Sequence, residues 1–139
     1  MVTTGLESLR ILLVEDEPFF QEVVAKILRG LGVSSVTSVK NGAEAIDTLS
    51  NVPGFFDLII SDIEMPEMAG FELVRRIRYG VVPRYKDIPI LMLTGHSTEG
   101  NVQKGKFHKI QGFIVKPPSP EALKRHITRA LRINPTPSA

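Results

Sequence analysis

Asp57-Leu58-Ile59-Ile60-Ser61-Asp62-Ile63-Glu64-Met65-Pro66 is the stretch that decides the fold. Its three consecutive apolar residues, 58–60, have no polar residue between them, which predicts a strand buried on both faces, as in a parallel sheet. Asp62 comes where that strand should end, and Pro66 excludes its continuation. Open α/β sheets bind their ligands at the carboxyl ends of their strands. Asp62 therefore either belongs to a binding site or makes a local Asx turn.

Length and composition predict one globular domain. The chain has 139 residues, of which 42% are hydrophobic and 23% charged, enough for a single buried core. It contains no Cys, which excludes disulfides, thiol catalysis and thiolate metal sites. It shows no basic-then-apolar leader and no apolar run of the roughly 20 residues that a membrane span needs. We expect a soluble cytoplasmic protein that does not bind membranes, with a poorly ordered lead-in (1–9), a domain (10–132) and a flexible tail (133–139).

Strand and helix patterns alternate five times along the chain. Strands are predicted at residues 10–14, 33–39, 58–62, 88–93 and 112–115. Helices are predicted at 18–30, around 43–49, after Gly70, at 97–109 and from Pro120 onward, the last capped by Ser119. The aromatic pair Phe19 and Phe20 is expected to lie in the core. This order predicts a three-layer (βα)5 α/β domain with a parallel sheet.

Polar residues follow four of the five predicted strands. They are Glu15 and Asp16 after the first, Asp62 after the third, Thr94 after the fourth and Lys116 after the fifth. In a parallel sheet these positions share one edge, and three carboxylates brought together there need a cation. Oxygen ligands without His or Cys suit Mg²⁺ rather than Zn²⁺. A carboxylate beside a metal, an ammonium group and a hydroxyl is a suitable acceptor for a phosphoryl group.

Four short segments together resemble the signature segments of response-regulator receiver domains. They are Val14-Glu15-Asp16-Glu17-Pro18, Ser61-Asp62-Ile63-Glu64-Met65-Pro66, Leu93-Thr94-Gly95 and Phe113-Ile114-Val115-Lys116-Pro117. The resemblance covers residues 10–132. It implies a flavodoxin-like fold with strand order 2-1-3-4-5, and a phosphoacceptor that is not an enzyme acting on external substrates.

The resemblance also implies how a metal is held. Asp62 is the implied phosphoacceptor. Asp16 and Asp62 would bind Mg²⁺ directly, with Mn²⁺ as an alternative, together with the backbone carbonyl of Glu64. Glu15 would help through water.

Other residues would hold the phosphoryl group and respond to it. By resemblance, Thr94 and Lys116 would hold phosphoryl oxygens, and Thr94 and Phe113 would form a switch. Phe113 can equally be a plain core residue. The Lys116–Pro117 peptide bond is expected to be cis.

The resemblance further implies a histidine kinase or phosphotransfer domain as the phosphoryl donor. No motif for nucleic-acid binding is present, and we expect a monomer or weak dimer. Residues 1–103 carry 9 Lys or Arg and 14 Asp or Glu, whereas residues 104–139 carry 8 and 1. All basic residues of the second part except Lys116 lie in the expected fourth helix, the fifth helix and the adjoining turns: Lys104, Lys106, Lys109, Lys124, Arg125, Arg129 and Arg132. This face, formed with the fifth strand, is either an output surface for an acidic partner or a solvated surface.

Three positions depart from the family pattern. Ala69 replaces the usual acidic residue before Gly70, which predicts a changed turn. Glu64 and His96 occupy the two positions that flank the path of the hydrolytic water, and we expect this pair either to set the lifetime of the phosphoryl group or to be merely solvated. The segment 107–110 lacks the glycine that usually precedes the fifth strand.

Two other functions fit the same residues. One is a Mg²⁺-dependent phosphatase or phosphotransferase that uses Asp62 as a transient nucleophile. Haloacid-dehalogenase-type enzymes, however, place their nucleophile after the first strand with a second Asp two residues later, where this chain has Pro18. The other is a receiver-like binding module that is never phosphorylated, although such a module has no need of the complete set of five polar residues.

Overall fold

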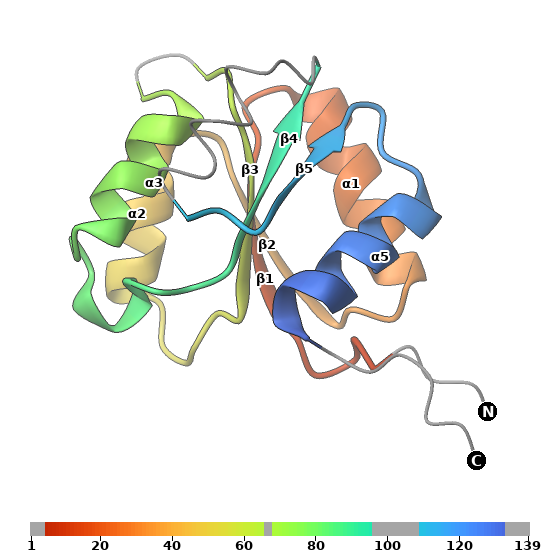
Figure 1. The fold of residues 1–139 in the computed structure, drawn as a ribbon, viewed down its shortest axis with the longest axis horizontal. Helices are drawn as coiled ribbons and strands as arrows, with labels where there is room; N and C mark the ends of the chain where they lie inside the picture. The colour runs from red at the N-terminus through yellow and green to blue at the C-terminus, as the bar shows by residue number, and fades with distance from the viewer. Residues whose placement is uncertain (1–4, 66–67, 96–108, 133–139) are drawn as a thin grey trace.

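The computed structural model describes residues 5–65, 68–95 and 109–132, in which strands and helices alternate (Figure 1). The strands are β1 (Arg10–Val14), β2 (Ser35–Val39), β3 (Leu58–Asp62), β4 (Ile90–Thr94) and β5 (Gly112–Val115). The helices are α1 (Pro18–Gly30), α2 (Gly42–Asn51), α3 (Gly70–Arg78), α5 (Pro120–Leu131) and the short 3₁₀ helix η1 (Pro83–Tyr85). The fourth helix expected over 97–109 lies outside the described residues, apart from Lys109. No helix in the described ranges is long and apolar enough to cross a membrane.

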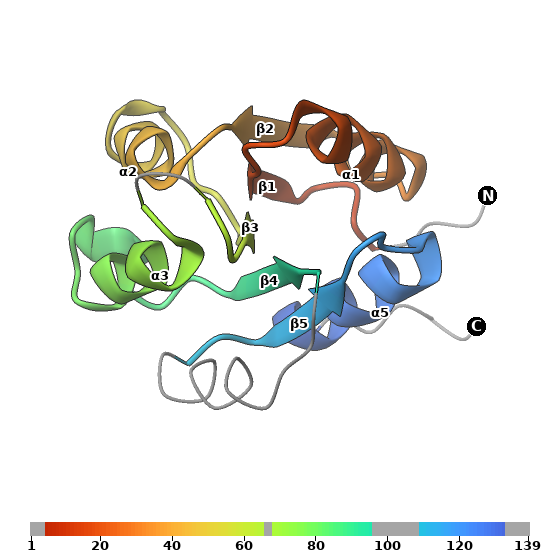
Figure 2. The ribbon, with the colours of Figure 1, turned by 90° about the horizontal axis from the view of Figure 1, so that it is seen from above.

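The five strands form one parallel sheet in the order β2-β1-β3-β4-β5, which Figure 2 shows from above. This confirms the predicted flavodoxin-like order. The register pairs Val14 with Ser61 and Asp62 with Leu93, and Thr94 pairs with Val115. The carboxyl ends of these four strands are therefore level with one another at one edge of the sheet.

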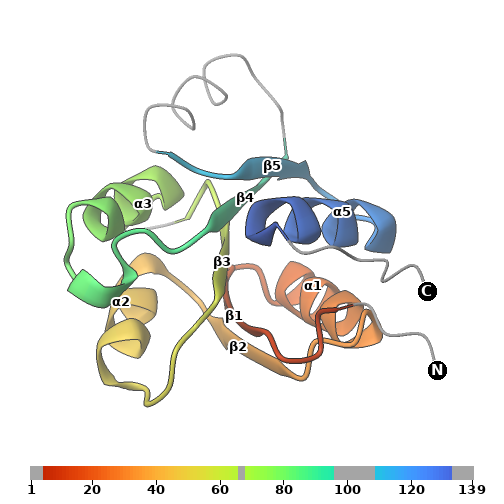
Figure 3. The same ribbon diagram turned by 60° about the horizontal axis from the view of Figure 1, so that its bottom comes forward.

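Alternate residues of the central strands enter two separate cores, one on each face of the sheet. Ile59 packs with α2 and α3, whereas Leu58 and Ile60 pack with α1 and α5. Figures 1 and 3 show these two helix pairs on opposite sides of the sheet. Every residue of β3 and β4 is buried, as the uninterrupted apolar run of β3 predicted. A slip of one residue in β3 would exchange its contributions to the two cores, so helix packing on both faces fixes its register.

Side-chain caps begin three of the helices, and one of them, Ser119, was predicted. The side chains of Glu17, Asn41 and Ser119 accept hydrogen bonds from backbone N–H groups in the first turns of α1, α2 and α5. Pro18 and Pro120 occupy the first helical positions, where the missing N–H costs nothing. These caps place the beginnings of α1 and α5 beside the ends of β1 and β5.

Two expectations about burial are wrong. Leu6 and Leu9 are buried in the core under α1 and α5, although residues 1–9 were expected to be a poorly ordered lead-in. Five residues are too few to show a periodic pattern, so their packing depends on the assembled domain. Phe19 was expected in the core but is 67% exposed, while Phe20 is partly buried. Helical spacing gives the face of a helix but not how far the neighbouring elements extend over its first turn.

Two strands begin two residues later than predicted. β2 begins at Ser35 rather than 33, and β4 begins at Ile90 rather than 88. Pro89 precedes β4 and has no N–H for strand pairing, although its carbonyl oxygen accepts a 3.0 Å hydrogen bond from the N–H of Ile59.

The connection into β5 takes a left-handed turn at Lys109, where φ is 58°. Glycine adopts this conformation with the least strain, and this chain adopts it at a lysine in the segment that lacks the expected glycine. The guanidinium of Arg78 donates to the carbonyl oxygen of Lys109 over 2.9 Å and to that of Ile88 over 2.8 Å. Arg78 thereby ties the connections that lead into β4 and β5 to the end of α3.

Candidate active site

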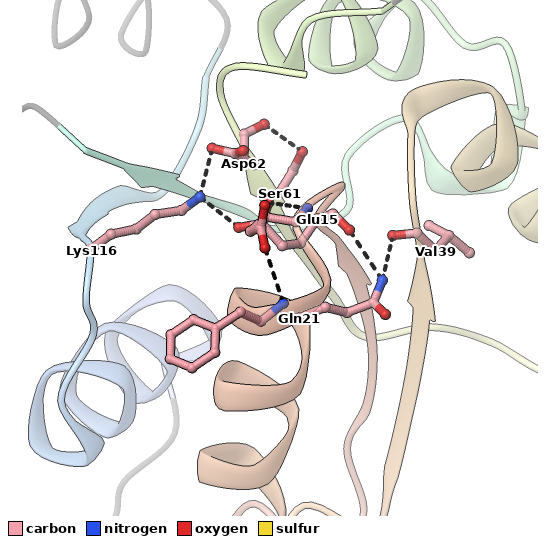
Figure 4. A network of polar contacts seen from close by, with 8 residues as sticks. Glu15, Gln21, Val39, Ser61, Asp62 and Lys116 are labelled. Atoms are coloured by element: carbon pink, nitrogen blue, oxygen red, sulfur yellow. Dashed lines mark hydrogen bonds and ion pairs between the residues drawn. The ribbon is translucent and has the colours of Figure 1, made fainter. Parts of the chain in front are cut away.

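Five polar residues predicted from separate parts of the sequence lie at the carboxyl edge of the sheet. Asp62 and Thr94 are the last residues of β3 and β4, and both are buried. Glu15 and Asp16 directly follow β1, and Lys116 directly follows β5. Figure 4 shows Glu15, Asp62 and Lys116 pointing toward one another. The strand-end pattern thus placed these residues at the correct edge, and the Lys116–Pro117 peptide bond is cis, as expected.

Lys116 bridges two carboxylates. Its Nζ lies 2.5 Å from Glu15 Oε1 and 3.2 Å from Asp62 Oδ1, and its side chain is only 13% exposed. Burial by itself lowers the pKa of Lys116, but the contact with Glu15 and the charge of Asp62 outweigh it, so the pKa of this ammonium group is raised. Lys116 is therefore held as a cation above the end of β3.

Glu15 carries a buried carboxylate that is only partly compensated. Burial, with a further contribution from the negative charge of Asp62, raises its pKa to about 7 despite the opposing effect of Lys116. Its Oε2 accepts a 3.3 Å hydrogen bond from the N–H of Glu17. No hydrogen bond of good geometry reaches Oε1, whose contact with Lys116 is an ion pair. The expectation that Glu15 helps to hold the metal through water did not include this direct contact with Lys116.

The carboxylates of Glu15, Asp16 and Asp62 form a group that suits a hard divalent cation. One oxygen from each lies within 4.8 Å of the others. Lys116 pairs with two of the three carboxylates, those of Glu15 and Asp62, so a divalent cation would relieve the repulsion that remains among the three. Oε1 of Glu15 is buried and has the ion pair with Lys116 but no hydrogen bond, so a cation or its water would add a further favourable contact there. These residues fit Mg²⁺.

A glutamine that was not predicted holds the ends of β1 and β2 together beneath this site. Nε2 of Gln21, on α1, donates to the carbonyl oxygens of Glu15 and Val39 over 3.1 and 3.2 Å (Figure 4). The N–H of Glu15 also donates to Val39 over 3.0 Å. On the other side of the site, the N–H of Lys116 donates to the carbonyl oxygen of Thr94 over 2.8 Å. No sequence signal points to Gln21, because its partners are backbone carbonyls that only the folded chain brings near.

The remaining predicted site residues are placed less centrally. The ring of Phe113 is partly buried and lies 6.4 Å from that of Phe71 on α3, an arrangement that suits either a switch or a plain core residue. The side chain of Glu64 is exposed. His96, Lys104 and Lys106 lie outside the described residues.

The loop after Asp62 returns to the sheet at Gly70. The N–H of Gly70 donates to the carbonyl oxygen of Ile63 over 2.7 Å. Ala69 is the N-cap of α3 and has the extended backbone of an ordinary cap, but it makes no side-chain hydrogen bond to the first turn. Ala69 therefore has an ordinary cap geometry without a capping group, and the turn that we expected to be changed includes residues 66–67, which lie outside the described residues.

We expect Ala69→Asp to stabilise the domain by about 1 kcal/mol, because a carboxylate at the N-cap can accept from a backbone N–H of the first turn and interacts favourably with the positive end of the helix dipole. Urea unfolding measures the gain. Ala69→Leu is the control, since it adds a side chain that cannot accept a hydrogen bond. Equal midpoints for the Asp and Leu variants would show that no cap forms.

Comparison with known proteins gives the family. The model of the response regulator receiver domain matches residues 11–128. The chain belongs to this family. The chemotaxis protein CheY of Pseudomonas aeruginosa is 29% identical over 127 residues, which cover 91% of this chain and 99% of that protein.

Two solved structures resemble this receiver domain. The chemotaxis response regulator CheY4 of Vibrio cholerae is 36% identical, with a TM-score of 0.78 over 88% of this chain and 98% of that one. The receiver domain of a signal transduction histidine kinase from Syntrophus aciditrophicus is 35% identical, with a TM-score of 0.77 over 95% and 97%. The chain is thus a receiver domain of the two-component and chemotaxis type, with the flavodoxin-like fold.

Proposed function

We propose that this receiver domain accepts a phosphoryl group on Asp62 in a Mg²⁺-dependent reaction, in the cytoplasm, from a histidine kinase or a phosphotransfer protein. The observation that carries the proposal is the position of Lys116, whose Nζ lies 3.2 Å from Asp62 Oδ1 within a cluster of three carboxylates. Thr94, buried at the end of the neighbouring strand β4, adds a hydroxyl that can donate to a phosphoryl oxygen. Simple neutralisation of the carboxylates by Lys116 would not require that hydroxyl.

In the proposed reaction a carboxylate oxygen of Asp62 attacks the phosphorus atom of the donor. The bond from phosphorus to the leaving nitrogen or oxygen breaks, and the leaving group keeps its electron pair and takes a proton from solvent. Lys116 and the hydroxyl of Thr94 stabilise the charge on the phosphoryl oxygens. Asp16, Asp62 and the carbonyl of Glu64 would hold Mg²⁺, with Glu15 nearby. When bound, the ion supplies positive charge to the same oxygens.

The aspartyl phosphate would then be hydrolysed slowly by water, without turnover of an external substrate. Glu64 and His96 would set its lifetime, because they occupy the positions that flank the path of the water. The rate at which the adduct decays in His96→Ala, compared with the unchanged chain, tests this role. Equal decay rates would contradict it.

The intact mass of the protein after incubation with Mg²⁺ and acetyl phosphate tests the main proposal. We expect one added phosphoryl group that is absent without Mg²⁺ and absent in Asp62→Asn. Asp57→Asn is the matched control: Asp57 precedes β3, at the opposite end of the strand from Asp62, and should not affect the adduct.

The absence of an adduct is interpreted by measuring the inorganic phosphate released from the donor. Mg²⁺-dependent release that Asp62→Asn abolishes indicates an aspartyl phosphate that turns over too fast to trap. Neither adduct nor release in the unchanged chain would reject the proposal and favour a binding module.

We also propose that the signal is transmitted to a partner through the face of β5 and α5, together with the expected fourth helix (97–109), which apart from Lys109 lies outside the described residues. Phosphorylation adds about −1.5 to −2 charges at Asp62, and Thr94 and Phe113 connect that site to β5. Val115 on β5 is 50% exposed, and Arg125, Arg129 and Arg132 on or directly after α5 are exposed. The positive charges of the three arginines would repel those of a second copy and so oppose a symmetric dimer through this face.

We therefore expect any self-association through this face to be weaker at low salt than at high salt, because salt screens the repulsion between basic residues. Sedimentation at two salt concentrations measures it. The double variant Arg125→Ala and Arg129→Ala should lose the dependence on salt. Self-association that weakens as salt is added would contradict this role for the basic residues.

A further inference from the structure

Lys116 has a third neighbour besides its two carboxylates. Its Nζ lies 4.7 Å from the centre of the Phe20 ring, in addition to 2.5 Å from Glu15 Oε1 and 3.2 Å from Asp62 Oδ1. The ammonium group is therefore enclosed by two carboxylates and an aromatic ring, which leaves its side chain 13% exposed.

The first turn of α1 places this ring. The side chain of Glu17 caps the helix by accepting from the N–H of Phe19, and Pro18 takes the first helical position, so Phe20 is the third residue of the first turn. Phe19 is 67% exposed and meets the Phe20 ring edge-on at 5.5 Å. Phe20 thus faces Lys116, whereas Phe19 lies on its solvent side.

An aromatic ring at this distance attracts a cation electrostatically, because the face of the ring carries negative charge. A lysine side chain is a flexible stem with four rotatable bonds, so contacts on several sides are needed to keep its ammonium group beside Asp62. Asp62 and Glu15 pull Nζ toward the sheet, and the ring limits its movement on the remaining side. A leucine is apolar but smaller than phenylalanine, and it offers no such attraction.

We propose that Phe20 is a positioning residue that holds the ammonium group of Lys116 over Asp62 for phosphoryl transfer. This inference rests on the proposed function, in which Lys116 stabilises the phosphoryl oxygens. Phe20 touches neither the donor nor Asp62 in this role and acts only through Lys116.

The first test examines the geometry without any reaction. A ring face near Nζ shifts the NMR signals of the adjacent Lys116 Hε protons upfield. We expect this shift in the unchanged protein and its loss in Phe20→Leu, whereas Phe19→Leu should retain it. Lys116 Hε signals at ordinary positions in the unchanged protein would overturn the inference.

The second test measures the rate of phosphorylation by acetyl phosphate. We expect Phe20→Leu to lower the rate about 2- to 30-fold, the range that a cation–π contact supplies. Phe20→Tyr should recover most of the rate, and Phe19→Leu should stay within about twofold. The dissociation constant for Mg²⁺, measured separately, should change less than about twofold in all of these variants, since Phe20 is not a ligand.

Fluorinated phenylalanines at position 20 separate the electrostatic effect from packing. Successive fluorine atoms withdraw charge from the ring face while the size of the ring changes little, so they preserve the fold even if Phe20→Leu does not. The rate should fall stepwise with each fluorine. A rate that is unchanged across this series, or equal in Phe20→Leu and the unchanged protein, would overturn the inference.

These outcomes are distinguishable from a failure of the proposed function. If the unchanged protein neither forms an adduct nor releases phosphate from the donor, phosphoryl transfer is rejected, and with it the role of Phe20 in that reaction. A working phosphoryl transfer that is insensitive to the ring rejects only the role of Phe20.

Discussion

Gly70→Ala is expected to destabilise the domain by about 2–3 kcal/mol and to impair the site around Asp62. A Cβ at this position would lie 2.3 Å from the carbonyl oxygen of Asp62 and 2.9 Å from Cα of Ile63. Both atoms belong to the backbone at the end of β3, which packing on two faces holds in place. The Cε of Met92, at 2.7 Å, can move aside, but the backbone atoms cannot, and such overpacking carries a cost of this size.

Urea unfolding measures the loss of stability, and the mass of the acetyl phosphate adduct measures the effect on Asp62. Gly30→Ala is the matched control, because Gly30 is the last residue of α1 and an added Cβ meets nothing within 4 Å. That variant should be neutral or more stable by up to about 1 kcal/mol. Equal stability of Gly70→Ala and the unchanged protein would show that the backbone at the end of β3 can move to accommodate the added Cβ at little cost.

The second large effect expected is a dependence of stability on pH that originates in Glu15. Folding raises the pKa of this carboxyl from 4.5 to about 7. Between these two values the folded protein holds a proton that the unfolded chain has lost. Without divalent ions, the contribution of Glu15 to the free energy of unfolding should therefore fall as pH rises from about 4.5 to about 7, and level off above that. The total fall is of the order of 1–3 kcal/mol.

Binding of Mg²⁺ should show the opposite dependence on pH. The ion requires ionised carboxylates, so protonation of Glu15 competes with it, and its affinity should rise about tenfold between pH 6 and pH 8. Urea unfolding in the presence of a chelator measures how stability depends on pH. Titration with Mg²⁺ between pH 6 and pH 8 measures how the affinity for the ion depends on pH.

Glu15→Gln isolates the contribution of Glu15, because it keeps the shape of the side chain and removes the titrating group. The free energy of unfolding of the unchanged protein, minus that of the variant, should fall as pH rises from about 4.5 to about 7. The contributions of the other titrating groups are the same in both proteins and cancel in this difference. Parallel pH profiles for the two proteins would show that Glu15 ionises normally in the fold.

The sequence predicted the parts of the site that the backbone alone determines. Asp62 and Thr94 end uninterrupted apolar strands, and Glu15 and Lys116 directly follow others, so the parallel sheet necessarily brings them to one edge. Each of these positions could be predicted without knowledge of any side-chain contact.

Contacts between side chains on different elements could not be predicted. Gln21 binds backbone carbonyls of two strands, and the ring of Phe20 meets Lys116 from a helix 96 positions away in the numbering. The burial of Leu6 depends in the same way on the assembled core. The direction in which α1 and α5 pack on the sheet decides all three, and no local pattern encodes that direction.

The residues of the site are spread from Glu15 to Lys116 over four strand ends, with Glu15 and Asp16 both following β1. None of the pairwise contacts is local in the chain, so the site cannot form before the central strands have paired, and contacts of this kind form late and slowly in folding. A ligand that needs all of them binds the native state alone, and its free energy of binding adds fully to the global stability. Mg²⁺ binding in this domain should therefore report on complete folding rather than on any single element.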